Sequence, residues 1–203
     1  MLRHSASALI LIVIVFCTKT VPGVAQPAAQ IVKWVVEKNS TLTVAGKSNV
    51  NSFTCIISQY DYNDTIYCYN NSNKPIRLSG NLRMNVLSFD CHSNLITKDL
   101  QKTLKADDYP KMTIRFISLQ AMPLFAAKTE FIKGWLEVEL AGVTKRFELN
   151  YCFTKNEAKC IRLTGARSFT FSDFNLSPPQ KFAGLIKIKD DFDVNFQLVL
   201  RAV

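Results

Sequence analysis

The sequence predicts an all-β fold, an antiparallel barrel or sandwich of many strands around one core. Apolar and polar residues alternate with a period of two through most of the chain, as in strands with one buried face. The strand-like runs are short and polar turns separate them. The 203 residues, of which 48% are hydrophobic and 11% aromatic, suffice for one sizeable core. Neither a linker nor an internal repeat divides the chain.

The first 25 residues have the pattern of a secretory signal peptide. Arg3 precedes an apolar run from Ala8 to Phe16, and small residues at 23–25 offer a cleavage site. The apolar run is shorter than the ~20 residues that cross a bilayer as a helix. We therefore expect residues 1–25 to be cleaved and residues 26–203 to form one exported domain. An uncleaved N-terminal anchor is the alternative.

The clearest strand pattern begins at Leu78. Even positions are apolar up to Val86, whereas odd positions are polar. Beyond Val86 the apolar residues move to Leu87 and Phe89, which a β-bulge explains because one extra residue reverses the faces. The same alternation predicts further strands over 130–140, 147–151 and 192–200, and shorter ones over 42–44, 53–57, 112–116 and 186–188.

One short amphipathic helix is expected near residues 97–106. Thr97 can cap its first turn, and Pro110 prevents its continuation. Three apolar residues line one side at i, i+4 and i+8 spacing: Ile96, Leu100 and Leu104. We expect this helix to close one end of the β-structure; a mobile lid over a ligand entrance is the alternative.

The charge of the chain does not indicate a nucleic-acid partner. Of the 25 basic residues, Arg3 and Lys19 lie in the signal peptide, which leaves 23 against 16 acidic residues and a formal net charge of +7. The basic residues are scattered through strand-like segments and form no block. An exported protein is also separated from nucleic acid, so we expect a solvated basic surface instead.

Five cysteines follow the signal peptide: Cys55, Cys68, Cys91, Cys152 and Cys160. Disulfides are favoured in an exported chain. Cys152 and Cys160 flank the TKNEA segment of an expected hairpin, which predicts a disulfide between them. Cys55 can reach either Cys68 or Cys91, and the sequence leaves both pairings open.

Asp90, Cys91 and His92 lie side by side and invite comparison with a catalytic or metal site. His92 is the only histidine after the signal peptide and no CxxC motif occurs, so the patterns of zinc sites are missing. Adjacent strand residues point to opposite faces, so Cys91 and His92 meet only in a distorted loop. We expect no metal, cofactor or catalytic site; an enzyme that uses Cys91 and His92 is the alternative.

Several motifs follow one another through the chain after the signal peptide. They are WVV at 34–36, LTVAGKSNVNSF at 42–53, FDCH at 89–92, KDL at 98–100 with Leu104, YP at 109–110, DF at 173–174, PP at 178–179 and GLIKIKD at 184–190. Together they resemble the YceI-like family of exported proteins, and the cysteine-containing form is similar to members from Bacteroidetes-type bacteria. Asn175 stands where the family usually has glycine; Asn tolerates the left-handed conformation, so we expect the turn to form.

The resemblance implies a lipocalin-like, extended antiparallel β-barrel of about eight strands in a periplasmic or secreted protein. Its apolar lumen would hold a long-chain isoprenoid, a quinone or a fatty amide, with the headgroup near the mouth beside Lys or Arg. Burial of each methylene contributes about 0.8 kcal/mol. We expect the lumen to be lined by Leu82, Met84, Val86, Phe89, Ile96, Leu100, Leu104, Phe116, Leu136, Phe147, Phe174, Ile186 and Phe196.

The main alternative is a fully packed structural or protein-interaction barrel of the cell envelope without a lipid ligand. A closed barrel of about eight strands can either fill its interior with side chains or keep a cavity for one ligand, and both produce the same alternation. A transient contact with a membrane surface and a homodimer stay open as further associations.

Overall fold

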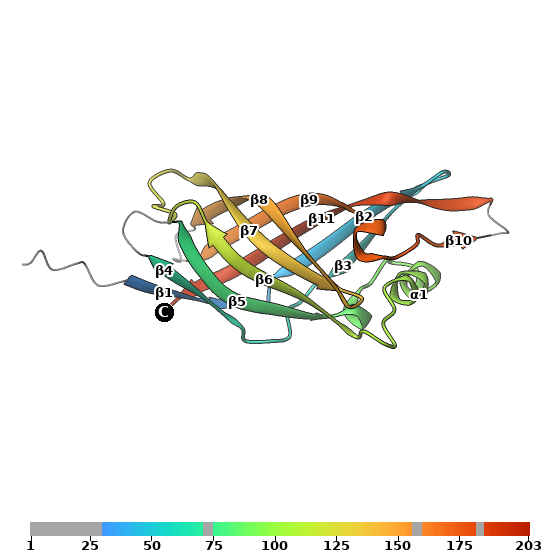
Figure 1. Cartoon of the computed structure of the whole chain (residues 1–203), viewed down its shortest axis with the longest axis horizontal. Helices are drawn as coiled ribbons and strands as arrows, with labels where there is room; N and C mark the ends of the chain where they lie inside the picture. Colours follow the sequence, from blue (N-terminus) through green and yellow to red (C-terminus); the bar gives the residue numbers. More distant parts are fainter. Residues whose placement is uncertain (1–29, 71–74, 156–159, 182–184) are drawn as a thin grey trace, which may run out of the picture.

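Eight strands form a closed, elongated antiparallel barrel, which confirms the expected fold class (Figure 1). The computed structural model describes residues 30–70, 75–155, 160–181 and 185–203, so the predicted signal peptide lies outside the described residues. In spatial order the ring contains β1 (Gln30–Val36), β4 (Thr65–Asn70), β5 (Ile76–Asn85), β6 (Lys111–Leu119), β7 (Thr129–Leu140), β8 (Val143–Lys155), β9 (Ile161–Thr170) and β11 (Ile186–Ala202). The last strand pairs with the first, because Val36 lies opposite Leu200.

Three further strands extend the barrel. They are β2 (Thr41–Ser48), β3 (Ser52–Ile57) and the short β10 (Gln180–Lys181). The 17-residue β11 pairs with β1 near its C-terminus and with β2 farther back, where Val194 lies opposite Val44. β1 and β2 therefore follow one another along the same edge of β11, which gives the molecule its length.

Alternating burial along the strands produces the core. In β7 the buried residues Ile132, Leu136 and Val138 alternate with residues that are exposed or partly exposed, as the sequence predicts. β8 and β2 follow the same pattern. Full burial of one such aliphatic side chain contributes about 1.5–3 kcal/mol, so the inward faces hold the barrel together.

The prediction of a β-bulge after Val86 is wrong. The buried positions do change from even to odd residue numbers there, as the sequence indicates. β5 ends at Asn85, and a 3₁₀ turn, η1 (Val86–Ser88), follows it. The Asn85 side chain accepts a hydrogen bond from the Leu87 backbone N at 2.9 Å. The turn leaves Leu87 54% exposed and returns Phe89 to the core. A tight turn therefore reverses the pattern, and no extra residue is inserted into a ladder.

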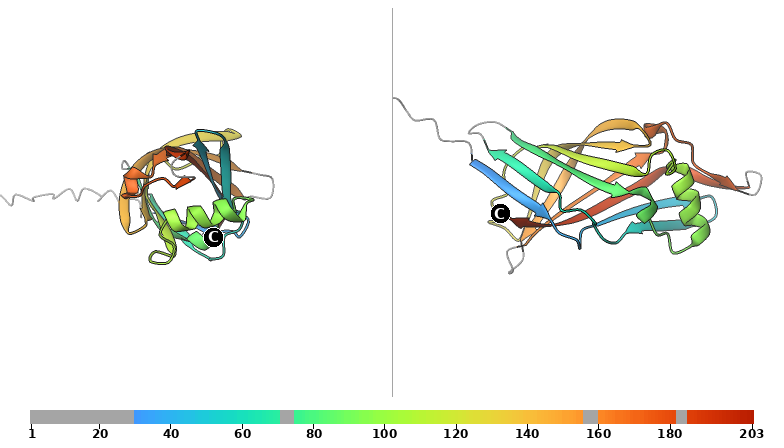
Figure 2. Two further views of the ribbon diagram at one scale, coloured as in Figure 1. Left: turned by 90° about the vertical axis from the view of Figure 1, so that its right-hand side faces the viewer. Right: turned by 90° about the horizontal axis from the view of Figure 1, so that it is seen from below.

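The predicted helix exists but begins three residues earlier than expected. α1 covers Asn94–Thr103, with Ser93 at its N-cap position. The Thr97 hydroxyl accepts a hydrogen bond from the Cys91 backbone N at 3.0 Å, so it orders the preceding loop instead of capping the helix. α1 lies across one end of the barrel, as expected (Figure 2). Within the part of the chain that the structure describes, no helix is long and apolar enough to cross a membrane.

A disulfide between Cys55 and Cys91 attaches β3 to the loop before α1. Beside it, Ile56 and Asp90 form an isolated bridge with backbone hydrogen bonds of 2.8 and 2.9 Å. Among the described residues, β3 and β5 do not pair with each other. The disulfide and the isolated bridge therefore connect this part of the wall. The structure thus selects Cys91 over Cys68 as the partner of Cys55, and Cys68 is a buried thiol.

The predicted disulfide between Cys152 and Cys160 is wrong. Cys152 is a free thiol, and the register of β8 and β9 places it opposite Thr164. Thr164 is four residues from Cys160, which corresponds to about 13 Å along a strand. A disulfide requires Cα atoms within about 7 Å of one another. The hairpin that suggested the pair therefore holds the two residues apart.

Candidate functional site

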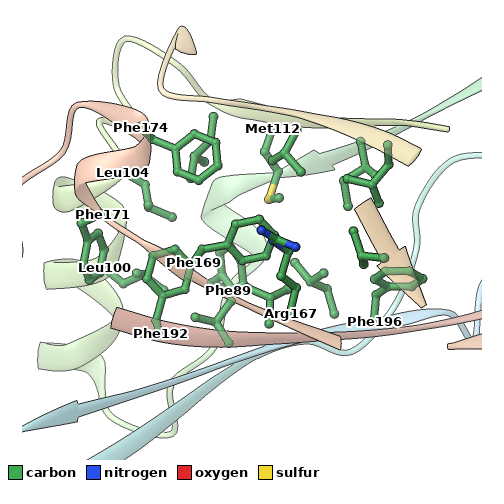
Figure 3. Close-up of a pocket in the computed structure, with 18 residues that line it drawn as sticks. Phe89, Leu100, Leu104, Met112, Arg167, Phe169, Phe171, Phe174, Phe192 and Phe196 are labelled. Atoms are coloured by element: carbon green, nitrogen blue, oxygen red, sulfur yellow. The ribbon is translucent and has the colours of Figure 1, made fainter. Parts of the chain in front are cut away.

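An apolar cavity of about 60 Å³ lies inside the barrel at the end covered by α1. Side chains from α1, from the turn after β9 and from several strands line it (Figure 3). The residues labelled there are Phe89, Leu100, Leu104, Met112, Arg167, Phe169, Phe171, Phe174, Phe192 and Phe196. Arg167 is the only charged residue among the described residues that line the cavity. The space is therefore suited to hydrocarbon, with one cation at its wall.

The turn after β9 directs two of these aromatic side chains into the cavity. A 3₁₀ turn, η2 (Ser172–Phe174), is held by two reciprocal hydrogen bonds: the Thr170 backbone N donates to Asp173 Oδ2 at 2.9 Å, and the Asp173 backbone N donates to Thr170 Oγ1 at 3.1 Å. Asn175 ends the turn in the left-handed conformation at φ 54°, as predicted. Phe171 and Phe174 are consequently buried.

Ring-to-ring contacts fix the shape of this part of the cavity. The rings of Phe147 and Phe169 meet edge to face with centroids 4.8 Å apart, and Phe174 packs on both at 6.2 and 6.1 Å. Phe171 and Phe192 form a second close pair at 4.8 Å. Such pairs contribute about 0.5–1.5 kcal/mol beyond the area that they bury.

A second hollow, a groove of about 190 Å³, lies on the outer side of the same end. The β2–β3 hairpin and α1 form its sides, and Ile186 and Ile188 of β11 contribute to it. Leu100 and Phe171 line both the groove and the inner cavity. These two side chains therefore separate the two spaces.

The half of the barrel farther from α1 is filled by aromatic side chains. The Tyr151 ring packs on Phe116, Phe153 and Phe196 with centroid distances of 6.1, 6.5 and 6.2 Å. The Tyr151 hydroxyl is buried without a hydrogen-bond partner, and burial raises its pKa above the usual range of tyrosine. Burial also raises the pKa of the Cys68 thiol to about 12. This half of the interior is packed core.

The predicted lumen residues divide into three groups. Six line the cavity: Phe89, Leu100, Leu104, Leu136, Phe174 and Phe196. Ile96 and Ile186 line the outer groove, together with Leu100. The remaining five are buried in the core and are not among the residues that line either space: Leu82, Met84, Val86, Phe116 and Phe147.

Sequence reasoning missed Arg167, Phe169 and Phe171 because it did not predict β9. The inward positions of this strand include Gly165 and Arg167, which interrupt the apolar pattern. The signal was nevertheless present, since Ile161, Leu163, Phe169 and Phe171 all stand at odd positions and are all buried.

The Asp90-Cys91-His92 segment is structural. The Cys91 sulfur is bonded to Cys55, so it is not the free thiol that a nucleophilic pair needs. The His92 backbone is left-handed at φ 56°, and its Nδ1 atom lies 4.0 Å from Asp90 Oδ2 at the surface. Among the described residues, no group of three or more His, Cys, Asp or Glu side chains could hold a metal ion.

Comparisons with known proteins show the same fold in solved structures at low sequence identity. No family model and no curated protein matches the sequence. BcnA of Burkholderia cenocepacia is 16% identical, with 79% of this chain and 95% of that one covered and a TM-score of 0.56. A polyisoprenoid-binding domain from Saccharophagus degradans is 13% identical, with 84% and 98% covered and a TM-score of 0.59.

A YceI protein of Campylobacter jejuni is 20% identical over 64% of this chain and 72% of that one, with a TM-score of 0.47. The chain has the barrel fold of BcnA and of the Saccharophagus polyisoprenoid-binding domain, along nearly the whole length of both.

Proposed function

We propose that the chain is a YceI-like lipid-binding protein that holds the tail of a long-chain isoprenoid, quinone or fatty amide beneath α1. The observation that carries the proposal is a cavity lined by apolar side chains, with a single charged residue among those described. The polyisoprenoid-binding domain of the same fold supports this choice of ligand class. Burial of hydrocarbon supplies the affinity, and non-catalytic binding is the proposed role.

The size of the cavity implies that a long tail must move side chains. A space of about 60 Å³ admits only a few methylene groups, whereas the outer groove adds about 190 Å³. If Leu100 and Phe171 change rotamer, the two spaces become one channel from the surface to Phe196. Each buried methylene contributes about 0.8 kcal/mol, which offsets the cost of such a rearrangement after a few carbons.

The eight predicted residues that line the two spaces are the proposed tail contacts. Phe89, Leu100, Leu104, Leu136, Phe174 and Phe196 would touch the inner part of the tail, and Ile96 and Ile186 the part near the entrance. The five deeper residues, Leu82, Met84, Val86, Phe116 and Phe147, would hold the shape of the wall.

We also propose that the protein acts outside the cytoplasm, in the periplasm or after secretion. The Cys55–Cys91 disulfide supports an oxidising compartment. Cleavage after residue 25 would release the domain, and a transient contact with a membrane surface would allow it to take up lipid.

Mass spectrometry of organic extracts from the purified protein tests the proposal. We expect a long-chain lipid in the extract of the wild type, and its loss in Leu136→Glu, which places a charge in the cavity. Phe131→Glu is the matched control, because Phe131 lies on the same strand but is 75% exposed. Val138→Phe, which fills the cavity without a charge, should lose the lipid too if Leu136→Glu fails to fold.

A packed structural or protein-interaction barrel is the second candidate. The aromatic cluster around Tyr151 favours it, because that half of the interior is filled. A wild-type protein that stays empty after exposure to farnesol, palmitoyl amide and a quinone would establish this candidate over the lipid carrier.

A further inference from the structure

The wall of the barrel is incomplete between β8 and β9 at the end covered by α1. The ladder between these strands runs from Lys155↔Ile161 to Tyr151↔Gly165. Among the described residues, 143–150 of β8 and 166–170 of β9 form no pairs with each other, although β7 and β11 pair with them on their other sides. We call this interval the β8–β9 seam.

Arg167 lies in the β8–β9 seam and reaches the cavity. It stands between Gly165 and Phe169 at an inward position of β9, it lines the cavity, and it is nevertheless exposed to solvent. Figure 3 shows its guanidinium among the apolar side chains of the site. An inward side chain is exposed only where the wall is open, so this guanidinium marks a connection between cavity and solvent.

Aromatic rings and one backbone oxygen hold the guanidinium in place. Its central carbon lies 4.8 Å from the centroid of the Phe147 ring and 5.8 Å from that of Phe169. Its Nη1 atom donates a hydrogen bond of 2.9 Å to the Glu148 carbonyl oxygen, a group that an intact ladder would have used. An arginine has five N–H donors, so most of them are left for another acceptor.

Neighbouring charges make the seam positive. No carboxylate of the described residues forms an ion pair with Arg167, whereas Arg83 pairs with Asp64 and Arg115 with Glu139. On the other side of the seam, Lys145 stands opposite Val138, which lines the cavity, and Lys145 is exposed. Both edges of the β8–β9 seam thus carry a cation at an inward register position.

We propose that Arg167 binds the anionic headgroup, a phosphate or carboxylate, of a lipid whose tail occupies the cavity, with Lys145 adding charge across the seam. The inference rests on the proposed function and narrows it to anionic lipids. A planar guanidinium that rings already orient matches the oxygens of such a group in geometry and in charge. A neutral lipid would leave these donors unused.

Farnesyl monophosphate and farnesol provide the test, because they share a tail and differ in the headgroup. Isothermal titration at low salt should show that the wild type prefers the phosphate by about tenfold or more, since hydrogen bonds to charged groups are the stronger ones. Arg167→Met should remove this preference, because the variant keeps an apolar stem but has neither the charge nor the N–H donors. Arg162→Met is the matched control, because Arg162 is exposed on the outer face of β9 and should keep the preference.

The possible failures are distinguishable. If the wild type binds farnesol but shows no preference for the phosphate, or if Arg167→Met keeps the preference, the headgroup inference is overturned and the proposed function stands. If the wild type binds neither probe, the headgroup inference and the proposed function are both overturned. Inorganic phosphate that binds as tightly as farnesyl monophosphate would assign the seam to free phosphate and overturn the inference. Arg167→Lys, which keeps the charge, should retain part of the preference and serves if Arg167→Met does not fold.

Discussion

Tyr151 has the only buried side-chain N or O atom without a hydrogen-bond partner in the part of the chain that the structure describes. The hydroxyl is buried, and the Tyr151 ring packs on Phe116, Phe153 and Phe196. An unsatisfied buried hydroxyl costs about 1–3 kcal/mol. We predict that Tyr151→Phe raises the free energy of unfolding by about 1 kcal/mol, measured by urea denaturation.

Tyr60 is the control for this prediction. It is buried as well, but its hydroxyl donates to Asp64 and accepts a hydrogen bond from the Arg83 backbone N at 3.2 Å. Burial, together with the hydrogen bond to Asp64, keeps the pKa of Tyr60 above its usual range. Tyr60→Phe should therefore lower the free energy of unfolding. A loss of stability of the same size in both variants would show that the Tyr151 hydroxyl has a partner.

Individual residues also show the limit of sequence reasoning. The left-handed Asn175 was predictable, because it stands where the YceI-like resemblance implies a glycine and asparagine tolerates the same conformation. The N-terminus of α1 was not, because the Thr97 hydroxyl could serve the helix or the preceding loop equally well. The Thr97 hydroxyl accepts from the Cys91 backbone N, and the position of Cys91 is determined by its disulfide to Cys55 in β3.

At the scale of the elements, the Cys55–Cys91 disulfide attaches the loop before α1 to β3. It joins residues 36 positions apart, and closing a loop of that length stabilises the fold by about 4 kcal/mol in the chain-entropy model. We predict that Cys55→Ser with Cys91→Ser lowers the free energy of unfolding by about 3–4 kcal/mol and speeds amide hydrogen exchange in α1.

Reduction provides an independent control for this double variant. A reducing agent should lower the stability of the wild type by the same amount and leave the Cys55→Ser, Cys91→Ser protein unchanged. Equal loss in both proteins would instead point to another disulfide. Unchanged exchange in α1 would mean that the apolar contacts of Leu100 and Leu104 hold the helix without the covalent link.

Strands were predictable where apolar residues recur at successive inward positions, as from Phe192 to Leu200 in β11. β9 was missed because Gly165 and Arg167 take inward positions for reasons outside the strand itself. An added Cβ on Gly165 would lie 2.4 Å from the Phe196 ring, so the glycine makes room for a neighbour. Arg167 occupies the seam that the end of the β8–β9 ladder creates. Both are consequences of tertiary packing.

At the scale of the whole molecule, the sequence predicted a closed barrel but not its division into a hollow and a filled half. Inward apolar residues alternate in the same way whether their side chains meet or leave a gap. Phe116 and Phe196 both face inward, yet only Phe196 lines the cavity. Whether an inward phenylalanine lines the cavity or fills the core depends on the orientation of its ring, and the periodicity of the sequence does not determine that orientation.

The α1 end of the molecule also exposes apolar side chains around the outer groove. Val50 and Leu95 line the groove and are each 64% exposed, and Leu185 is 76% exposed. The Asn49 side chain joins the segments of Val50 and Leu185, because it donates to the Leu185 carbonyl oxygen at 2.9 Å and accepts from the Lys187 backbone N at 3.0 Å. Exposed lysines, among them Lys187, lie at the same end.

This apolar rim predicts that the protein contacts membranes with its α1 end. Burial of an exposed leucine contributes about 1.5–3 kcal/mol, so Leu95→Ser with Leu185→Ser should weaken binding to vesicles of phosphatidylcholine and phosphatidylglycerol at least tenfold in a flotation assay. Leu124→Ser is the matched control, because Leu124 is 81% exposed but lies in the β6–β7 connection at the opposite end (Figure 1). If Leu124→Ser weakens binding as much, the contact is unspecific and the α1 end has no special role in reaching the lipid.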